Sequence, residues 1–153
     1  MDNIAEHNLN DKVGVIAFNI DGMHHALVAS ILGYEGGIGV RNGCFCAHPY
    51  VKNLLRVNQE DEHKLTEEIK HGDKSNLPGM VRASFGCYNN EEDIERLVDM
   101  LDRIIKKDYK GEYVMNPETG VYSVKGFKLD VEQYFPLHRK SQISGEQMYP
   151  ESA

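Results

Sequence analysis

The densest group of reactive side chains lies between residues 41 and 49, in the sequence RNGCFCAHP. This segment places the thiols of Cys44 and Cys46, the imidazole of His48 and the guanidinium of Arg41 close together in the chain. A thiolate beside a cation, or at the start of a helix, has a lowered pKa and is a competent nucleophile. The segment therefore indicates a nucleophilic cysteine. The alternative is that both thiols are small buried apolar side chains in a turn between a strand and a helix.

The cysteines also allow a zinc site. Cys44, Cys46 and His48, together with the distant Cys87, would supply four ligands of the types that zinc prefers. However, Cys44 and Cys46 are separated by one residue, whereas zinc-binding cysteines are usually two to four residues apart. Three cysteines cannot form a complete disulfide framework, and this usage favours a reducing, cytoplasmic compartment.

Arg82 stands at the centre of an apparent strand, in the sequence VRASF. An arginine among small and apolar residues is costly to bury without an anion. Its planar guanidinium suits a carboxylate, to which it can donate two parallel hydrogen bonds. Arg82 is therefore a candidate carboxylate-binding residue, and the alternative is a structural salt bridge to one of the 24 acidic residues.

Two histidine pairs carry weaker signals. His24-His25 begins a predicted helix, and on spacing alone a solvated helix start is the simpler interpretation. His63-Lys64 lies in a strongly charged stretch and indicates a solvated helix face.

The elements that must position these residues follow from hydrophobic periodicity. Their predicted order is strand, helix, strand, helix, helix, strand, helix, which favours an α/β fold with helices on one face of a three- or four-stranded sheet. The predicted strands and helices are 13–20, 23–35, 38–41, 47–55, 58–72, 80–88 and 90–107, with further short strands at 113–115, 121–124 and 127–129. The last long helix is expected to bury an apolar face formed by Ile94, Leu97, Val98, Leu101, Ile104 and Ile105.

Length and charge limit the classes of function. A chain of 153 residues predicts one domain, here with a lead-in at 1–12, the domain at 13–107 and a partly disordered extension at 108–153. The 17 basic and 24 acidic residues give a net charge of −7, which disfavours nucleic acid as a partner. No apolar run reaches the ~20 residues that span a membrane, and the polar N-terminus is not a signal peptide, so we expect a cytoplasmic protein.

Three sequence blocks resemble a known family. They are GVIAFNIDGMH at 14–24, RNGCFCAHP at 41–49 and RASFGCYNNEEDI at 82–94. In this order they resemble the C-terminal small domain of class V aminotransferases, the fold-type I pyridoxal phosphate (PLP) enzymes that include cysteine desulfurases. The resemblance covers roughly residues 12–107.

The resemblance implies roles for individual residues. Cys46 matches the catalytic cysteine of SufS-type desulfurases, which takes the sulfur of the substrate and becomes a persulfide. Arg82 matches the residue that binds the α-carboxylate of a small amino-acid substrate. His24 matches a family position to which we assign no catalytic role. The resemblance also implies PLP as cofactor, a homodimeric parent enzyme and a possible sulfur-acceptor protein.

The sequence departs from the family pattern in three ways. Cys44-Phe45 replaces the two residues usual before the cysteine, although a similar Cys-Phe-Cys occurs in molybdenum cofactor sulfurases. The 36 positions from Cys46 to Arg82 exceed the gap in typical desulfurases, and the extra length is the charged stretch near 58–79. No lysine has the setting of the PLP-binding lysine, because His63-Lys64 is the only His-Lys pair.

We therefore expect the large PLP-binding domain to lie in a longer parent enzyme, and the isolated chain to be inactive alone. The parent is expected to be a desulfurase or a related lyase. Two alternatives from other classes remain: a stand-alone α/β binding or regulatory domain, and a small zinc-binding module.

Overall fold

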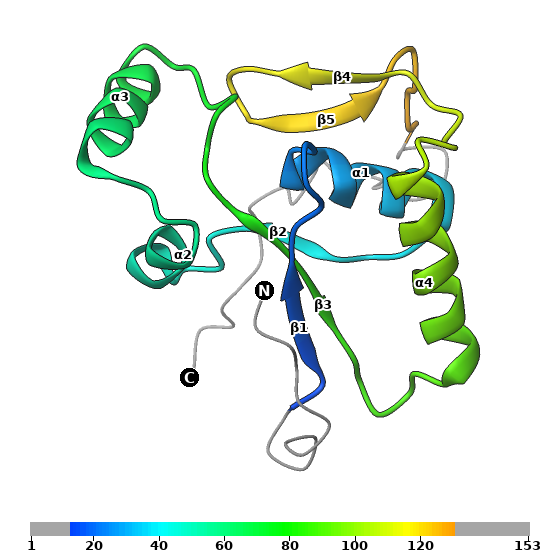
Figure 1. Cartoon of the computed structure of the whole chain (residues 1–153). Coiled ribbons are helices and arrows are strands. Elements are labelled where there is room, and N and C mark those ends of the chain that lie inside the picture. Colours follow the sequence, from blue (N-terminus) through cyan, green and yellow to red (C-terminus); the bar gives the residue numbers. More distant parts are fainter. Residues whose placement is uncertain (1–12, 131–153) are drawn as a thin grey trace, which may run out of the picture.

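The structure, a computed structural model, describes residues 13–130. Figure 1 shows its elements. In chain order they are β1 (Val15–Phe18), α1 (His25–Gly36), β2 (Arg41–Gly43), α2 (His48–Leu54), α3 (Gln59–Lys70), β3 (Met80–Ser84), α4 (Glu91–Ile105), β4 (Tyr113–Asn116) and β5 (Val121–Val124). The predicted order of strands and helices and the α/β fold class are confirmed. The expected lead-in at 1–12 and part of the expected extension, 131–153, lie outside the described residues.

A three-stranded antiparallel sheet, in the order β1-β3-β2, forms the centre of the fold. β3 is the middle strand, and its sequence MVRAS alternates between the two faces of the sheet. Val81 and Ala83 are buried on one face, whereas Arg82 between them points to the other. β2 begins at Arg41, later than the predicted strand at 38–41, because only Arg41–Gly43 pair with β3.

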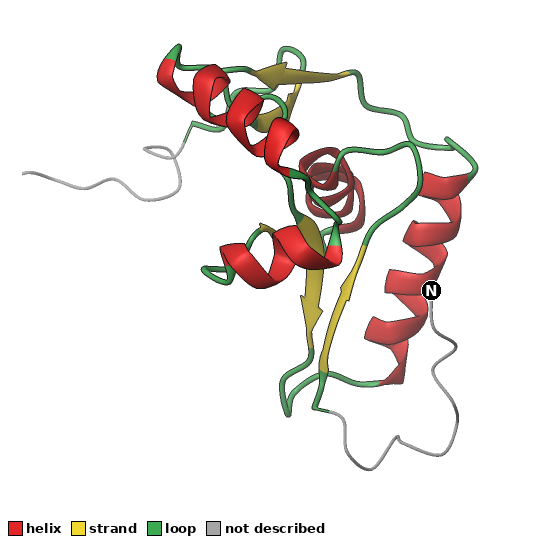
Figure 2. Ribbon diagram, turned by 60° about the vertical axis from the view of Figure 1, so that its left-hand side comes forward, coloured by secondary structure: helices red, strands yellow, loops and turns green. Residues whose placement is uncertain are grey.

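Helices α1 and α4 cover one face of this sheet. Their buried residues form a single core with those of β3: Val28, Ile31, Leu32, Val81, Ala83, Leu97, Met100 and Ile104. Figure 2 shows α4 running beside the strands, with α2 on their other side. Among residues 13–130, no long helix packs along the other face of the sheet.

Helix α4 begins with a capping box, in which Asn90 and Asp93 each accept a hydrogen bond from the backbone N–H of the other. Its buried face differs from the predicted one. Leu97, Met100 and Ile104 are buried, whereas the side chains of Ile94, Val98 and Ile105 are exposed, which corrects the sequence prediction. The small sheet covers only the stripe of α4 that contains the three buried residues, and the three exposed apolar residues form a second stripe that the sheet does not cover.

Helix α3 is predicted correctly as an exposed helix, since it has no buried residue. Asn58 caps it by accepting a hydrogen bond from the Asp61 N–H at 2.8 Å. Figure 1 shows α2 and α3 on the side of the sheet away from α4. Within residues 13–130, no helix has the length and apolar character needed to cross a membrane.

The chain after α4 forms a two-stranded hairpin, β4–β5, which packs against α1. The predicted strands near 113–115 and 121–124 are confirmed, but 127–129 is not a strand. The Glu35 carboxylate fastens this region to α1 by accepting hydrogen bonds from the Lys110 and Gly111 N–H groups and from the Tyr113 hydroxyl, at 2.9–3.1 Å.

Candidate functional site

Two arginines lie side by side on the open face of the sheet. Arg41 of β2 is the register partner of Arg82 of β3, and residues directly opposite in an antiparallel pair project from the same face. On the other side of Arg82, its partner in β1 is Ala17, a residue with a short side chain. The register therefore concentrates two positive charges on one face.

Neither arginine forms an ion pair or a hydrogen bond within the described part of the chain. The Nε atom of Arg82 is buried and has no hydrogen-bond partner. The alternative interpretation, a structural salt bridge of Arg82, is not found among residues 13–130. A buried donor without a partner is costly, so this position suits an anionic ligand.

The loop after β2 brings the cysteines to this face. Cys44 to Ala47 form a turn in which the Ala47 N–H donates to the Cys44 carbonyl at 2.7 Å. Its two central residues, Phe45 and Cys46, have φ angles of 53° and 63°. Turns with two positive φ angles usually carry Asn-Gly, because other residues are strained there. We call residues 44–47 the cysteine loop.

The Phe45 ring connects the cysteine loop to Arg82. The Arg82 guanidinium carbon lies 5.3 Å from the centre of this ring, within the range of a cation–π contact. The residue next to Cys46 therefore touches the candidate carboxylate-binding arginine, and the structure brings the two predicted site residues into one region.

The two cysteines of the loop have different surroundings. Cys46 is exposed, whereas the Cys44 thiol is partly buried and donates to the Pro78 carbonyl at 3.1 Å. Burial raises the pKa of Cys44, and the positive charge of Lys52 offsets part of this effect. Cys46 is therefore the more accessible of the two thiols.

The cysteines do not assemble a metal site. Cys87 follows β3 at the end where Ser84 lies, while the cysteine loop is next to the opposite end, at Met80. Among residues 13–130 there is no group of three or more His, Cys, Asp or Glu side chains that could hold a metal ion. The zinc-binding alternative has no support in the described geometry.

The histidine pair at the start of α1 is not simply a solvated helix end. His25 is 8% exposed, and its Nε2 donates to the Leu77 carbonyl at 2.9 Å. His24 is the N-cap residue, and its Nδ1 accepts from the Ala26 N–H at 3.2 Å. By contrast, His63 and Lys64 are exposed on α3, as predicted, and Lys64 lies 4.0 Å from Glu68.

Sequence reasoning missed two features of this region. The side-by-side placement of Arg41 and Arg82 depends on strand register, which hydrophobic pattern alone does not give across 41 positions of chain. The role of Phe45 depends on its positive φ angle, and the sequence gives no signal for that angle because the residue is not glycine or asparagine.

A sequence profile of the family "Aminotransferase class-V" matches residues 1–97, more than half of the chain. The chain belongs to this family.

Curated relatives give more detail. The chain is 32% identical over 136 residues to "Molybdenum cofactor sulfurase 2" of Aedes aegypti, a match that covers 81% of this chain and 18% of that protein. It is 34% identical over 99 residues to a "Probable cysteine desulfurase" of Pyrococcus abyssi, which covers 65% of this chain and 19% of that protein. The chain thus spans about a fifth of the length of these relatives.

Among solved structures, the cysteine desulfurase CsdA of Escherichia coli, in an S-sulfonic acid form, is 26% identical to this chain. The superposition has a TM-score of 0.44 and covers 67% of this chain and 23% of that one.

Proposed function

We propose that this chain is the C-terminal small domain of a longer PLP-dependent enzyme that removes sulfur from an amino acid, as a cysteine desulfurase or a related lyase. The observation that carries the proposal is the pair of arginines without anionic partners, touched by the loop that holds the exposed Cys46. A class V family membership and desulfurase relatives support the same reading.

Each residue has a role that its chemistry fits. Arg82 binds the substrate α-carboxylate through two parallel hydrogen bonds, and Arg41 adds a second positive charge beside it. The Cys46 thiolate attacks the sulfur atom of the substrate. An S–S bond forms as the substrate C–S bond breaks, the electron pair of that bond stays on the substrate carbon, which takes up a proton, and Cys46 is left as a persulfide; this requires an accessible thiolate. Phe45 holds the Arg82 guanidinium by its ring face.

The described residues do not themselves fit PLP. The cofactor is bound through a lysine, and every described lysine except Lys52 is exposed. Lys52 forms an ion pair with Glu62, and Lys64 of the His63-Lys64 pair lies on the exposed face of α3. PLP would act as an electron sink held by a large domain of the longer protein, and the proposal assigns no PLP-binding residue to this chain.

Further parts of the proposal concern the longer protein. It is a cytoplasmic homodimer, and it passes the sulfur of Cys46 to an acceptor protein. The 153-residue chain alone is catalytically silent, because its described residues provide no lysine that fits PLP. Sulfide release from cysteine by the purified chain with added PLP tests this, and clear turnover would contradict it.

The decisive experiment uses the longer protein with the matched variants Cys46→Ala and Cys44→Ala. We expect Cys46→Ala to abolish sulfur release and to leave the visible absorbance of bound PLP unchanged, because the thiol is not part of the cofactor site. Cys44→Ala should retain most activity. Full activity in the Cys46→Ala variant would eliminate the persulfide mechanism.

A second candidate function is sulfur transfer to a molybdenum cofactor. It is favoured by the match to the Aedes aegypti protein, which covers more of this chain than the Pyrococcus abyssi match does. The two candidates share Cys46 and Arg82 and differ in the acceptor. Incubation of the persulfide-loaded longer protein with isolated molybdenum cofactor, followed by sulfur analysis of that cofactor, separates them.

A further inference from the structure

A cavity of about 340 Å³ lies beside the cysteine loop. Its walls come from the first residues of α1, from β2 and the cysteine loop, from α2 and α3, and from the turn between β4 and β5. We call it the histidine pocket; the residues that matter for its chemistry are His24, Leu65, Ile69, Leu77, Pro78 and Val121. Its volume is within the range of small-molecule sites.

The histidine pocket contains one polar hydrogen without a partner. His24 Nδ1 accepts from the Ala26 N–H, so in the neutral imidazole the proton is on Nε2. That Nε2 atom is buried and makes no hydrogen bond with any residue in 13–130. Burial, and then the neighbouring His25 ring, lower the pKa of His24, and the nearby Leu77 carbonyl offsets part of this effect. His24 is therefore neutral at pH 7. The Leu77 carbonyl that interacts with it already accepts from His25 at 2.9 Å, and by hydrogen-bond geometry the His24 Nε2–H has no partner of its own.

Most other polar groups of the pocket wall have partners, and His48, which also lines the pocket, is exposed to solvent. His25 Nε2 is bonded to the Leu77 carbonyl and the Cys44 thiol to the Pro78 carbonyl. Lys52 and Glu62 form an ion pair with each other. A molecule that enters the pocket therefore meets mainly apolar side chains and, among the buried polar atoms of the described wall, one unsatisfied donor, that of His24.

Charge further restricts the ligand. The cationic group of Lys52 is neutralised by Glu62, so a carboxylate would lack a counter-charge. A cation would meet the N–H donor of His24 and would have no unpaired carboxylate to replace its water. From these observations we infer that the histidine pocket binds a small, neutral, mainly apolar molecule that carries one carbonyl-type hydrogen-bond acceptor.

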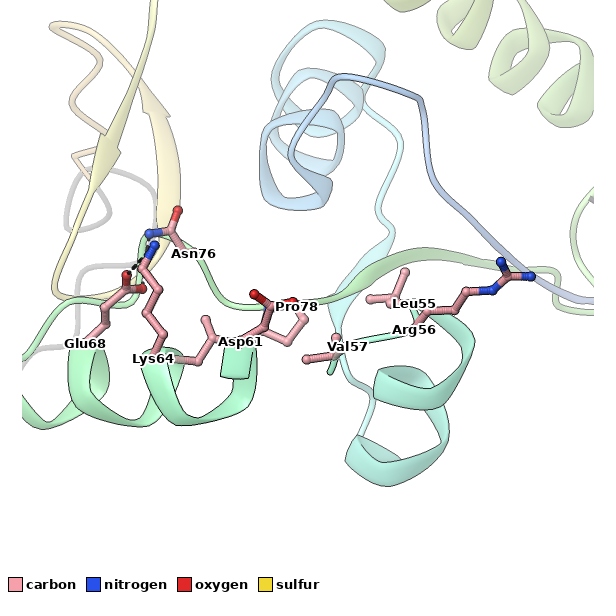
Figure 3. Close-up of a pocket in the computed structure, with 9 residues that line it drawn as sticks. Leu55, Arg56, Val57, Asp61, Lys64, Glu68, Asn76 and Pro78 are labelled. Carbon is pink, nitrogen blue, oxygen red and sulfur yellow. Dashed lines mark hydrogen bonds and ion pairs between the residues drawn. The ribbon is translucent and has the colours of Figure 1, made fainter. Parts of the chain in front are cut away.

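The neighbouring hollow shown in Figure 3 serves as a contrast. It lies between α2 and α3 and shares Leu65 and Pro78 with the histidine pocket. Three of its polar side chains interact: Asn76 donates to Glu68 at 3.1 Å, and Lys64 lies 4.0 Å from the same carboxylate. No comparable free buried donor is found among its described residues.

The histidine pocket is also distinct from the candidate active site. Neither Arg41, Arg82 nor Cys46 lines it, whereas Cys44 does. The cysteine loop therefore has the pocket on one side and the arginine pair on the other. The inference does not depend on the proposed function, because it concerns binding by this chain alone.

The test is a titration of the full 153-residue chain with acetophenone and with ethylbenzene, followed by NMR. The two probes have similar size, and only acetophenone has a carbonyl acceptor. We expect acetophenone to shift the methyl resonances of Val121 and Ile69 saturably, together with the His24 imidazole resonance. Ethylbenzene should bind at least tenfold more weakly.

Three variants complete the test. His24→Asn keeps the helix cap, because asparagine is a preferred N-cap residue, and removes the imidazole donor. It should abolish the preference for acetophenone. Ile69→Trp should fill the cavity and weaken binding of both probes, while His63→Asn, on the exposed face of α3, should change neither.

Failure to shift the Val121 and Ile69 resonances in the folded chain would overturn the inference. Equal binding of the two probes would also overturn it, as would a preference for acetophenone that is unchanged in His24→Asn. Either result means that the Nε2–H of His24 does not bind the carbonyl oxygen of the probe.

Discussion

The two faces of the three-stranded sheet differ in polarity: one is apolar and covered by helices, and the other is open and carries positive charge. On the covered face, Val81 and Ala83 pack against α1 and α4 in one apolar core. On the open face, Arg41 and Arg82 stand together without an anionic partner, beside a turn with two residues in the left-handed region. Alternation along β3 places these environments one residue apart.

The difference shows where stability and chemistry reside. Burial of apolar surface on the covered face stabilises the fold, since each buried aliphatic side chain contributes roughly 1.5–3 kcal/mol. The open face is costly, because unpaired charge and strained turns each oppose folding by about 1–3 kcal/mol. Substitutions on the two faces should therefore act on different measured quantities.

The largest expected effect on stability belongs to the covered face. Leu97→Ala should lower the free energy of unfolding by ~2–5 kcal/mol, because it leaves a cavity between α4 and the sheet. Val98→Ala, one residue further along the same helix, should lower it by less than about 0.5 kcal/mol, since the Val98 side chain is 58% exposed. Urea unfolding of the 153-residue chain measures both. A Leu97→Ala loss below about 1 kcal/mol would contradict the assignment of this face as core.

On the open face, the next effect is kinetic. Arg82→Lys in the longer protein should reduce kcat/KM for the amino-acid substrate by roughly 10- to 100-fold, because an ammonium cannot reproduce two parallel hydrogen bonds to a carboxylate. The unfolding midpoint should change little. Arg56→Lys, at an exposed position outside the arginine pair, is the control. Equal kinetics for the two variants would remove Arg82 from the site.

A smaller, pH-dependent effect is expected at Glu35, on α1. Burial alone would raise the pKa of Glu35, but hydrogen bonds from Gly111, Lys110 and Tyr113, together with the charge of Arg103, outweigh it and lower the pKa below its ordinary value. A lowered pKa in the folded state stabilises the fold above the unfolded-state pKa, and this stabilisation is lost as the pH falls through the folded-state pKa.

Glu35→Gln should therefore lower the free energy of unfolding by about 1–2 kcal/mol at pH 7, because an amide N–H₂, which cannot accept a hydrogen bond, replaces one carboxylate oxygen. The difference from the unmodified chain should shrink as the pH falls below about 4. Thermal unfolding at pH 7, 5 and 3.5 measures it, with Glu95→Gln on the exposed side of α4 as control. A difference that grows toward low pH would contradict the assigned direction.

The parts of this architecture that sequence predicts are those with local causes. The start of α4 follows from Asn90 and Asp93, and the exposure of α3 follows from its charge. The buried stripe of α4 was predicted only in part, because Ile94, Val98 and Ile105 are apolar and the extent of the sheet decides which stripe it covers. Hydrophobic periodicity locates the apolar face of a helix, but it does not give the width of the sheet that covers this face.

The candidate site divides in the same way. Residue type and the family resemblance predict Cys46 and Arg82 as a nucleophile and a carboxylate ligand. Their approach to each other through Phe45, and the pairing of Arg41 with Arg82, are tertiary and have no local signal. The free donor of His24 likewise has no signal in the sequence, because it depends on which ring nitrogen accepts the hydrogen bond from the Ala26 N–H.

The way in which the β4–β5 hairpin is attached affects how a ligand can enter the histidine pocket. Within 113–124, Gly120 is the only buried residue, and the hairpin region is held by hydrogen bonds to Glu35 and by the Ser30 hydroxyl, which donates to the Tyr122 carbonyl at 2.9 Å. A segment attached by few buried groups opens more often than the core. Thr119, Gly120 and Val121 form one wall of the histidine pocket, so local opening of the hairpin would give a ligand access to the pocket. The amide protons of the hairpin should then exchange with solvent before those of α1 and β3.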